Sequence, residues 1–300
     1  MRRSQYDVAD TVLTTDPAAV GGETIRIAKR LFPNAPAPAL ERAFADAGGM
    51  YRGEHRDYLA CDTEYHDIQH VLDVTLAMVR LMDGYQRGGR NDYPALSKEV
   101  YLVGVLAALF HDFGYLRRRN DHKHRHGAEY TLVHVSRGAS FLRSYARGLG
   151  VEERLAQAAA TLVHFTGYER PVESIRLGDD TLRRLGQMLG TADIIAQMAD
   201  RCYLEKCRER LYPEFVLGKL GGFASGDDLV LKTPSFYEGA CKRLDEKLEG
   251  SYHFAERHFG GPNLYLDEMR KNISYAQTMV KSGQIAQRLR RRPPQTLVRP

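Results

Sequence analysis

The apolar positions along most of the chain recur with the period of an α-helix. In residues 70–82 they cover much of a helix circumference, which is typical of a helix deep inside an all-α core. Residues 97–112 have the same character, with Ser97 as the predicted N-cap and Glu99 in the first turn, where a negative charge suits the helix dipole. The pattern therefore predicts two buried helices in this part of the chain.

Other segments continue the helical pattern, while the two-residue alternation of strands is scarce. Residues 83–94 contain Gly, Asn and Pro and predict a loop between the first two helices. No internal repeat and no proline-rich linker divides the chain, so we expect a single compact all-α domain. Its predicted bounds are 21–287, after an N-terminal extension, 1–20, and before a basic disordered tail, 288–300. Further helices are predicted at 127–148, 151–164, 179–209, 235–259 and 265–289.

The composition is that of a soluble globular protein. Of the 300 residues, 43% are apolar and 27% are charged, and no apolar run approaches the roughly 20 residues of a membrane span. The N-terminal segment lacks the continuous apolar region of a secretory signal, so we expect a cytoplasmic protein. The four cysteines form no CxxC pair, which favours reduced thiols over disulfides or a zinc finger. They are Cys61, Cys202, Cys207 and Cys241.

The formal net charge of +5 comes mostly from the C-terminal tail. Such a short basic end is more often a solvated terminus than an arm for nucleic acid, so nucleic acid is not the expected partner. The arginines of the tail are Arg288, Arg290, Arg291, Arg292 and Arg299.

Two of the eleven histidines, His66 and His70, stand four residues apart and would share one helix face. A third, His111, precedes Asp112 at the end of a helix so apolar that an unpaired buried charge would be costly. A metal would remove that cost. The alternative is that Asp112 caps or pairs locally while His111 bonds a carbonyl. Asp193 is a further carboxylate in an apolar setting, where an ionised group needs a strong partner.

His70, His111, Asp112 and Asp193 together form a mixed nitrogen and oxygen set, suited to Zn, Mn or Fe. Ligands on separate helices can converge in the core of a bundle, which is a common place for sites with two metals. The residues alone thus indicate a metal centre, without fixing the metal.

The segments "YHDIQHVLDV", "ALFHDFGY" and "TADI" resemble the H…HD…D signature of the HD-domain metal-dependent phosphohydrolases. The resemblance covers roughly residues 58–210, and the first segment is similar to an element of class I cyclic nucleotide phosphodiesterases. It implies an HD-type helical bundle that holds two divalent ions (Zn, Mg, Mn or Fe). The implied ligands are His70, His111, Asp112 and Asp193, with Asp112 bridging both ions.

The same resemblance implies hydrolysis of a nucleotide or cyclic nucleotide by a hydroxide that bridges the metals, with His66 as general acid. "VHVSRGASFL" and "LVHFTGY" look like extra ligand segments of HD hydrolases and nominate His134 and His164, each with a core histidine as the alternative. Glu129 resembles a glutamate that bonds metal-bound water, with a solvated helical glutamate as the alternative. Asp67 stands where the phosphodiesterase element has Asn, and we expect its negative charge near the substrate.

For substrate contacts, the basic run 117–126 would lie at the rim of the site, where arginine and lysine can bind phosphate. Arg117 and Lys123 are the candidates, although a charge run is usually a solvated loop. Gln197 follows Asp193 by one turn and is a third candidate. Phe236 and Tyr237 offer a ring, with a core role as the alternative.

Two other functions remain open at this point. In one, a six-residue set that includes His134 and His164 holds two irons and activates oxygen, as in some HD-fold oxygenases. In the other, the chain is a catalytically silent module that binds a nucleotide or nucleic acid. The expected partner is a small phosphoester, with no membrane and a homo-oligomer allowed.

Overall fold

The computed structural model describes residues 2–88, 94–283 and 285–297, and in these residues the chain is all-α. No sheet forms among them, and their β-type pairing is limited to two isolated bridges, Tyr6–Leu13 and Tyr58–Arg118. The predicted fold class is therefore confirmed. Part of the loop predicted at 83–94 falls on 89–93, outside the described residues, and α3 (Ile68–Arg87) covers its beginning.

The α-helices of the described residues differ widely in length. They are α1 (Pro17–Leu31), α2 (Ala37–Tyr51), α3 (Ile68–Arg87), α4 (Lys98–Leu109), α5 (His134–Gly148), α6 (Glu153–Leu162), α7 (Asp180–Ala199), α8 (Tyr203–Lys206), α9 (Tyr212–Leu217), α10 (Gly226–Lys242), α11 (Phe254–Phe259), α12 (Leu264–Ser282) and α13 (Ile285–Arg288). Single turns of tighter or wider helix join them: η1 (Phe113–Tyr115), η2 (Gly127–Tyr130), η3 (Val163–Phe165), η4 (Val172–Ser174), η5 (Cys207–Leu211), η6 (Arg243–Lys247) and η7 (Ser251–His253). Long connections precede α3, α5 and α7.

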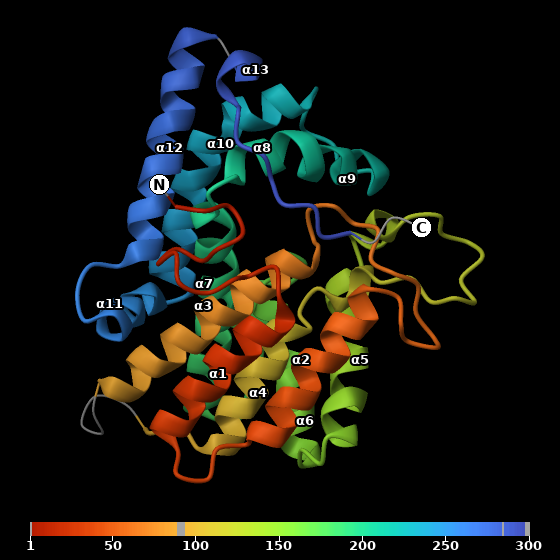
Figure 1. Cartoon of the computed structure of the whole chain (residues 1–300), viewed down its shortest axis with the longest axis vertical. Helices are drawn as coiled ribbons and strands as arrows, with labels where there is room; N and C mark the ends of the chain where they lie inside the picture. Colours follow the sequence, from red (N-terminus) through yellow and green to blue (C-terminus); the bar gives the residue numbers. More distant parts are fainter. Residues whose placement is uncertain (1, 89–93, 284, 298–300) are drawn as a thin grey trace.

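Helices α3 and α7 form the centre of the arrangement. They pack against each other, and α3 also contacts α1, α4 and α11, while α7 contacts α12. Figure 1 shows α1, α2, α4, α5 and α6 on one side of this central pair and α8, α9, α10 and α12 on the other. Candidate ligands on α3 and α7 therefore lie on the two helices at the centre of the fold. No helix among the described residues is long and apolar enough to cross a membrane.

Local sequence explains where α3 and α4 begin. Asp67 is the N-cap of α3, and its side chain accepts a hydrogen bond from the amide of His70 at 2.9 Å. Ser97 caps α4 as predicted, accepting from the amide of Val100 at 3.2 Å. From Tyr101 to Leu109 every residue of α4 is buried, which fits its uniformly apolar sequence.

Several predicted helices are interrupted where the backbone needs a turn. The range 127–148 splits into η2 and α5, and 179–209 breaks at Asp200, whose extended ψ of 133° ends α7. The range 265–289 breaks at Gly283, whose φ of 65° is the left-handed conformation that glycine adopts easily. In 235–259 the helix starts earlier, at Gly226, because Ser225 provides the cap.

The tail is not free in its described part. Leu289 is buried, Arg210 donates to the carbonyl of Pro294 at 2.6 Å, and the hydroxyl of Thr296 donates to Asp67. This corrects the disorder expected from composition for 288–297, because buried polar groups supply partners that the charge count does not reveal. Arg299 lies outside the described residues, and the domain bounds stay a prediction.

Candidate metal centre

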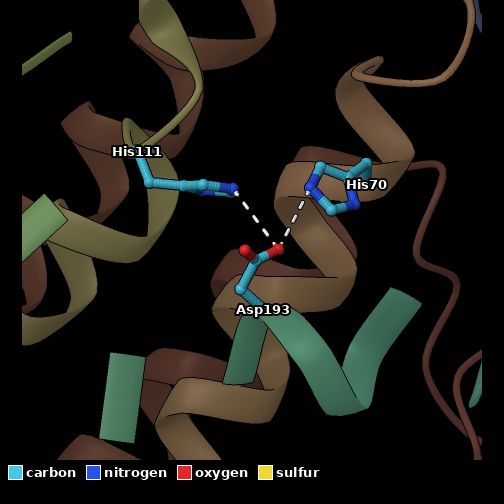
Figure 2. A group of neighbouring side chains, drawn as sticks. All are labelled: His70, His111 and Asp193. Carbon is cyan, nitrogen blue, oxygen red and sulfur yellow. Dashed lines mark ion pairs between the residues drawn. The ribbon is translucent and has the colours of Figure 1, made fainter. Parts of the chain in front are cut away.

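Three helical regions bring two imidazoles and two carboxylates together. The Nε2 of His70, in the first turn of α3, lies 3.2 Å from Asp112 Oδ2 and 3.6 Å from Asp193 Oδ1. The Nε2 of His111 lies 3.1 Å from Asp112 Oδ2 and 4.0 Å from Asp193 Oδ1. Figure 2 shows both rings pointing at the Asp193 carboxylate from opposite sides. One ligand atom from each of His70, His111 and Asp193 fits within 4.8 Å, so a single ion can reach all three.

The turn after α4 sets the positions of His111 and Asp112. The helix ends at Leu109, and η1 follows directly after Asp112. Gly114 lets this turn approach α5, since a Cβ there would lie 1.8 Å from the carbonyl oxygen of His134. The Nε2 of His134, at the start of α5, consequently lies 3.5 Å from Asp112 Oδ1. The two oxygens of Asp112 thus face histidines on two sides.

Hydrogen bonds fix which nitrogen each histidine offers. The Nδ1 of His111 donates to the carbonyl of Ala108 at 2.8 Å, and the Nδ1 of His134 donates to the carbonyl of Thr131 at 2.6 Å. Carbonyls only accept, so each ring keeps its Nδ1 proton and turns Nε2 toward the carboxylates; Nε2 donates when the ring is protonated and offers a lone pair to an ion when the ring is neutral. The His111 Nε2 is also buried without a hydrogen bond. A backbone carbonyl behind a ligating imidazole is the usual support of a metal ligand, and these residues fit a divalent ion.

The electrostatics of the group favour a cation among these side chains. Burial opposes the charged form of Asp112, but His111 outweighs it and holds the pKa of Asp112 well below its usual range. Burial likewise opposes protonation of His111, yet the Asp112 carboxylate raises the pKa of His111 to about 9. The carboxylate is therefore ionised, as a metal ligand must be. Burial lowers the pKa of His134 and favours the neutral ring that ligates.

His66 forms a pair with a residue that sequence reasoning missed. Its Nδ1 lies 2.5 Å from the Oε2 of Glu214 on α9, and the other oxygen of Glu214 accepts from the amide of Tyr65 at 2.6 Å. Burial alone would lower the pKa of His66, but the Glu214 carboxylate outweighs it and raises that pKa. The ring stacks on Tyr115, with centroids 4.4 Å apart, and Tyr115 stacks on His134 at 4.3 Å.

No motif pointed to Glu214, which is nevertheless only 3% exposed. It follows a proline in "LYPEFVL", and a glutamate inside an apolar run is the one sequence signal that could have drawn attention to it. Its partner, 148 residues earlier, is set by tertiary packing.

Two nominated residues bond side chains or amides close to them in sequence. The Nδ1 of His164 is 2.7 Å from Glu169 Oε1, and the described contacts of His164 do not include the ligand group. Glu129 is exposed and accepts from the amides of Arg125 and His126, closing a capping box at η2. The Glu129 carboxylate is taken up by neighbouring amides, while His164 is bonded at Nδ1 alone, so its role as a ligand stays a prediction.

The basic run is also used locally. Arg117 donates to Asp62 at 2.8 Å, and Lys123 is exposed; neither lines the cavity described below. Gln197 does line it, with its Oε1 accepting from the hydroxyl of Tyr65 at 3.0 Å. Asp67 is fully buried and faces Arg210 at 3.4 Å, so its negative charge is compensated instead of directed at a substrate.

A cavity of about 530 Å³ opens beside the group. His66, His70, Asp112, His134 and Asp193 line one part of it. Its size falls in the range of small-molecule sites, and it brings His66 into one compartment with four of the candidate ligands. The arrangement can hold a divalent cation, present an anionic ligand to it, and supply a proton from His66.

Comparison with known proteins adds the fold and the family. A search of curated proteins found no match. The chain is similar to the crystal structure of the phosphodiesterase domain of the RhoPDE fusion protein from the choanoflagellate Salpingoeca rosetta. The TM-score is 0.54 and the identity is 13%, over 94% of this chain and 96% of that one, so the likeness shows the fold.

The Npun_R2479-like family model matches residues 47–249, a range that contains every candidate ligand together with Glu214. The match covers more than half of the chain. The chain belongs to the Npun_R2479-like family.

Proposed function

We propose that this chain is a metal-dependent hydrolase of phosphodiesters. The observation that carries the proposal is one cavity in which His70, His111, Asp112 and Asp193 converge beside His66, a histidine with raised pKa. His70, His111, Asp112 and Asp193 would hold one ion, while Asp112 and His134 would face a second. Bound divalent ions would polarise the phosphoryl oxygens and lower the pKa of a bound water.

The chain's own residues supply the remaining chemistry. Glu214 favours the protonated form of His66 and orients its ring, so that the Nε2 proton can be given to the leaving oxygen. Tyr115 keeps that ring in place by stacking on it. Gln197, fixed through its oxygen by Tyr65, presents its amide NH₂ group to a substrate.

A nucleotide or cyclic nucleotide is the substrate class that the phosphodiesterase-like fold suggests for this chain, by analogy alone. The oxygenase reading needs His164 in the ligand set, and no described ion pair joins His164 to Asp112 or Asp193, as one joins His134 to Asp112. A silent binding module would have little use for buried ionisable groups that converge in a cavity.

The test is metal analysis of the purified full chain, followed by assays on mono-, cyclic and dinucleotides and on simple phosphodiesters. Asp112→Asn is the blank, since it removes a ligand charge. Divalent metal together with hydrolysis that the blank lacks supports the proposal. Equal turnover by Asp112→Asn would overturn it.

A further inference from the structure

The cavity has an apolar wall as well as its metal-ligand group. The wall comes from the segment 211–236, which includes the end of η5, α9 and the first part of α10. The side chains of Phe215 and Phe223 stack there, with ring centroids 5.7 Å apart. The wall residues are Leu211, Phe215, Leu220, Phe223, Leu229 and Phe236. An aliphatic chain or a ring against this surface would leave water, which favours binding.

Large apolar side chains around the same cavity are exposed to an unusual extent. Leu132 is 71% exposed, Tyr168 is 70% exposed and Phe236 is 49% exposed, and all three line the cavity. Scattered exposed apolar residues are ordinary, but three that line one cavity mark a binding surface for an apolar group.

The charged residues of the lining point to the same substrate type. Lys232 is the one lysine or arginine among the described residues of the cavity wall, and its Nζ already contacts Asp228 and the carbonyl of Gly222, each at 2.8 Å. Asp112 and Asp193 line the same space but would be taken up by the bound ion, and Glu169 adds a further carboxylate that contacts His164. A second anionic group on a substrate, away from the ion, would therefore find no unpaired lysine or arginine in the described lining to bind it.

We propose that the cavity takes a phosphodiester with a single negative charge, at the reacting phosphate, and with an apolar substituent that lies along the Phe215–Phe223–Phe236 wall. This inference rests on the proposed function and narrows its substrate. Nucleoside di- and triphosphates and other polyanions are disfavoured by it, while monoanionic diesters that carry an aliphatic chain or a ring are favoured.

The test uses the full chain loaded with its divalent metal and has two readouts. The first is the affinity for dimethyl, diethyl and dibutyl phosphate by calorimetry. The second is kcat/KM for the methyl, butyl and hexyl esters of p-nitrophenyl phosphate. A buried methylene contributes about 0.8 kcal/mol, so each is expected to raise the affinity and kcat/KM by up to about fourfold.

A matched pair of esters isolates the charge. The 3-carboxypropyl ester of p-nitrophenyl phosphate has nearly the length of a butyl or pentyl ester and adds one carboxylate. We expect its kcat/KM to be lower by about tenfold or more, since like charges repel in a desolvated site. Equal values for the two kinds of ester would overturn the charge argument.

Phe236→Ser tests the wall itself, because that side chain is half exposed and its loss leaves the core intact. The expected result is a smaller ratio of hexyl to methyl kcat/KM and of dibutyl to dimethyl affinity. Val280→Ser, on α12 and 44% exposed, is the matched control and should keep both ratios.

The outcomes separate the two proposals. Dialkyl phosphates that bind with no dependence on chain length overturn the apolar substrate, whatever the turnover. Binding that rises with chain length, with no hydrolysis of any ester, supports the apolar site and instead overturns the hydrolase.

Discussion

The imidazole of His66, in the bend before α3 and so not on one helix face with His70 as predicted, lies 2.5 Å from the carboxylate of Glu214 on α9. Burial opposes the protonated imidazole, but Glu214, together with Asp112 and Asp193, raises the pKa of His66 and favours its protonated form beside the candidate ligands. Substitutions of His66 and of Glu214 each test the role of this pair in proton donation.

His66→Ala should lower kcat by about 10²–10⁴-fold, the usual contribution of a general acid. The metal content should stay normal, because the nearest described partner of His66 is Glu214 and not a ligand carboxylate. Kinetics on a phosphodiester and metal counting of the same sample check this. Loss of metal in this variant would make His66 a ligand.

Glu214→Gln should also lower kcat, by less than His66→Ala, since the glutamine can still orient the ring but no longer favours its charge. Metal content and folding are the controls. Full activity would show that the proton on His66 does not depend on Glu214. A matched change is Glu209→Gln on the same segment, where the side chain is half exposed and the kinetics should stay at the level of the unchanged protein.

Asp112→Asn should lose at least one metal ion together with activity. One oxygen of Asp112 faces His70 and His111, and the other faces His134. Replacing the carboxylate by an amide removes the negative charge that lies next to all three histidines. Elemental analysis and turnover should fall together. Full occupancy with full activity would contradict a bridging role.

Gly114→Ala should displace the turn that holds His111 and Asp112, because the added Cβ would lie 1.8 Å from the carbonyl oxygen of His134. We expect a lower melting temperature and weaker metal binding. Gly22→Ala is the control, since α1 has nothing within 4 Å of that position and alanine favours a helix by up to about 1 kcal/mol. A Gly114→Ala protein with normal metal affinity would contradict this account of the turn.

Stability should depend on pH through a buried ion pair far from the metal centre. Asp7 lies 2.5 Å from Arg80; burial opposes its ionisation, but Arg80 and the amides of Val12 and Thr11 outweigh this and lower the pKa of Asp7 from 3.8. An Asp with a depressed pKa stabilises the fold above its unfolded value, and that stability is lost as the pH falls through the folded value.

Urea unfolding below pH 4 should therefore show a progressive loss of stability that Asp7→Asn reduces. At neutral pH, Asp7→Asn should cost about 3–5 kcal/mol, because it leaves Arg80 buried without its partner. A loss under about 1 kcal/mol would show that Arg80 finds another acceptor. Asp10→Asn is a control, since Asp10 pairs with exposed Arg3.

Much of the fold, and a group of side chains that could hold an ion, follows from local pattern. Helical periodicity located the helices around His70, His111 and Asp193, and each of these candidate ligands stands at a helix end or on a buried face that the pattern reveals. Glu214 and the apolar wall of 211–236 could not be found this way. They belong to short and irregular turns of helix whose partners are distant in sequence. The bonds of Arg117 to Asp62 and of Glu129 to the amides of Arg125 and His126 could not be predicted, because a charge run does not say which neighbour each side chain will bond.

The distance along the chain between the ligands has a practical consequence. His70 lies on α3, Asp193 on α7 and His111 in the turn after α4, and an unfolded chain scatters these candidate ligands, so only the folded state would chelate an ion tightly. A cation present at a thousand times its dissociation constant would then add about 4.1 kcal/mol to the free energy of unfolding. Chelators should consequently lower the melting temperature, which turns a simple thermal scan into a titration of the bound ion.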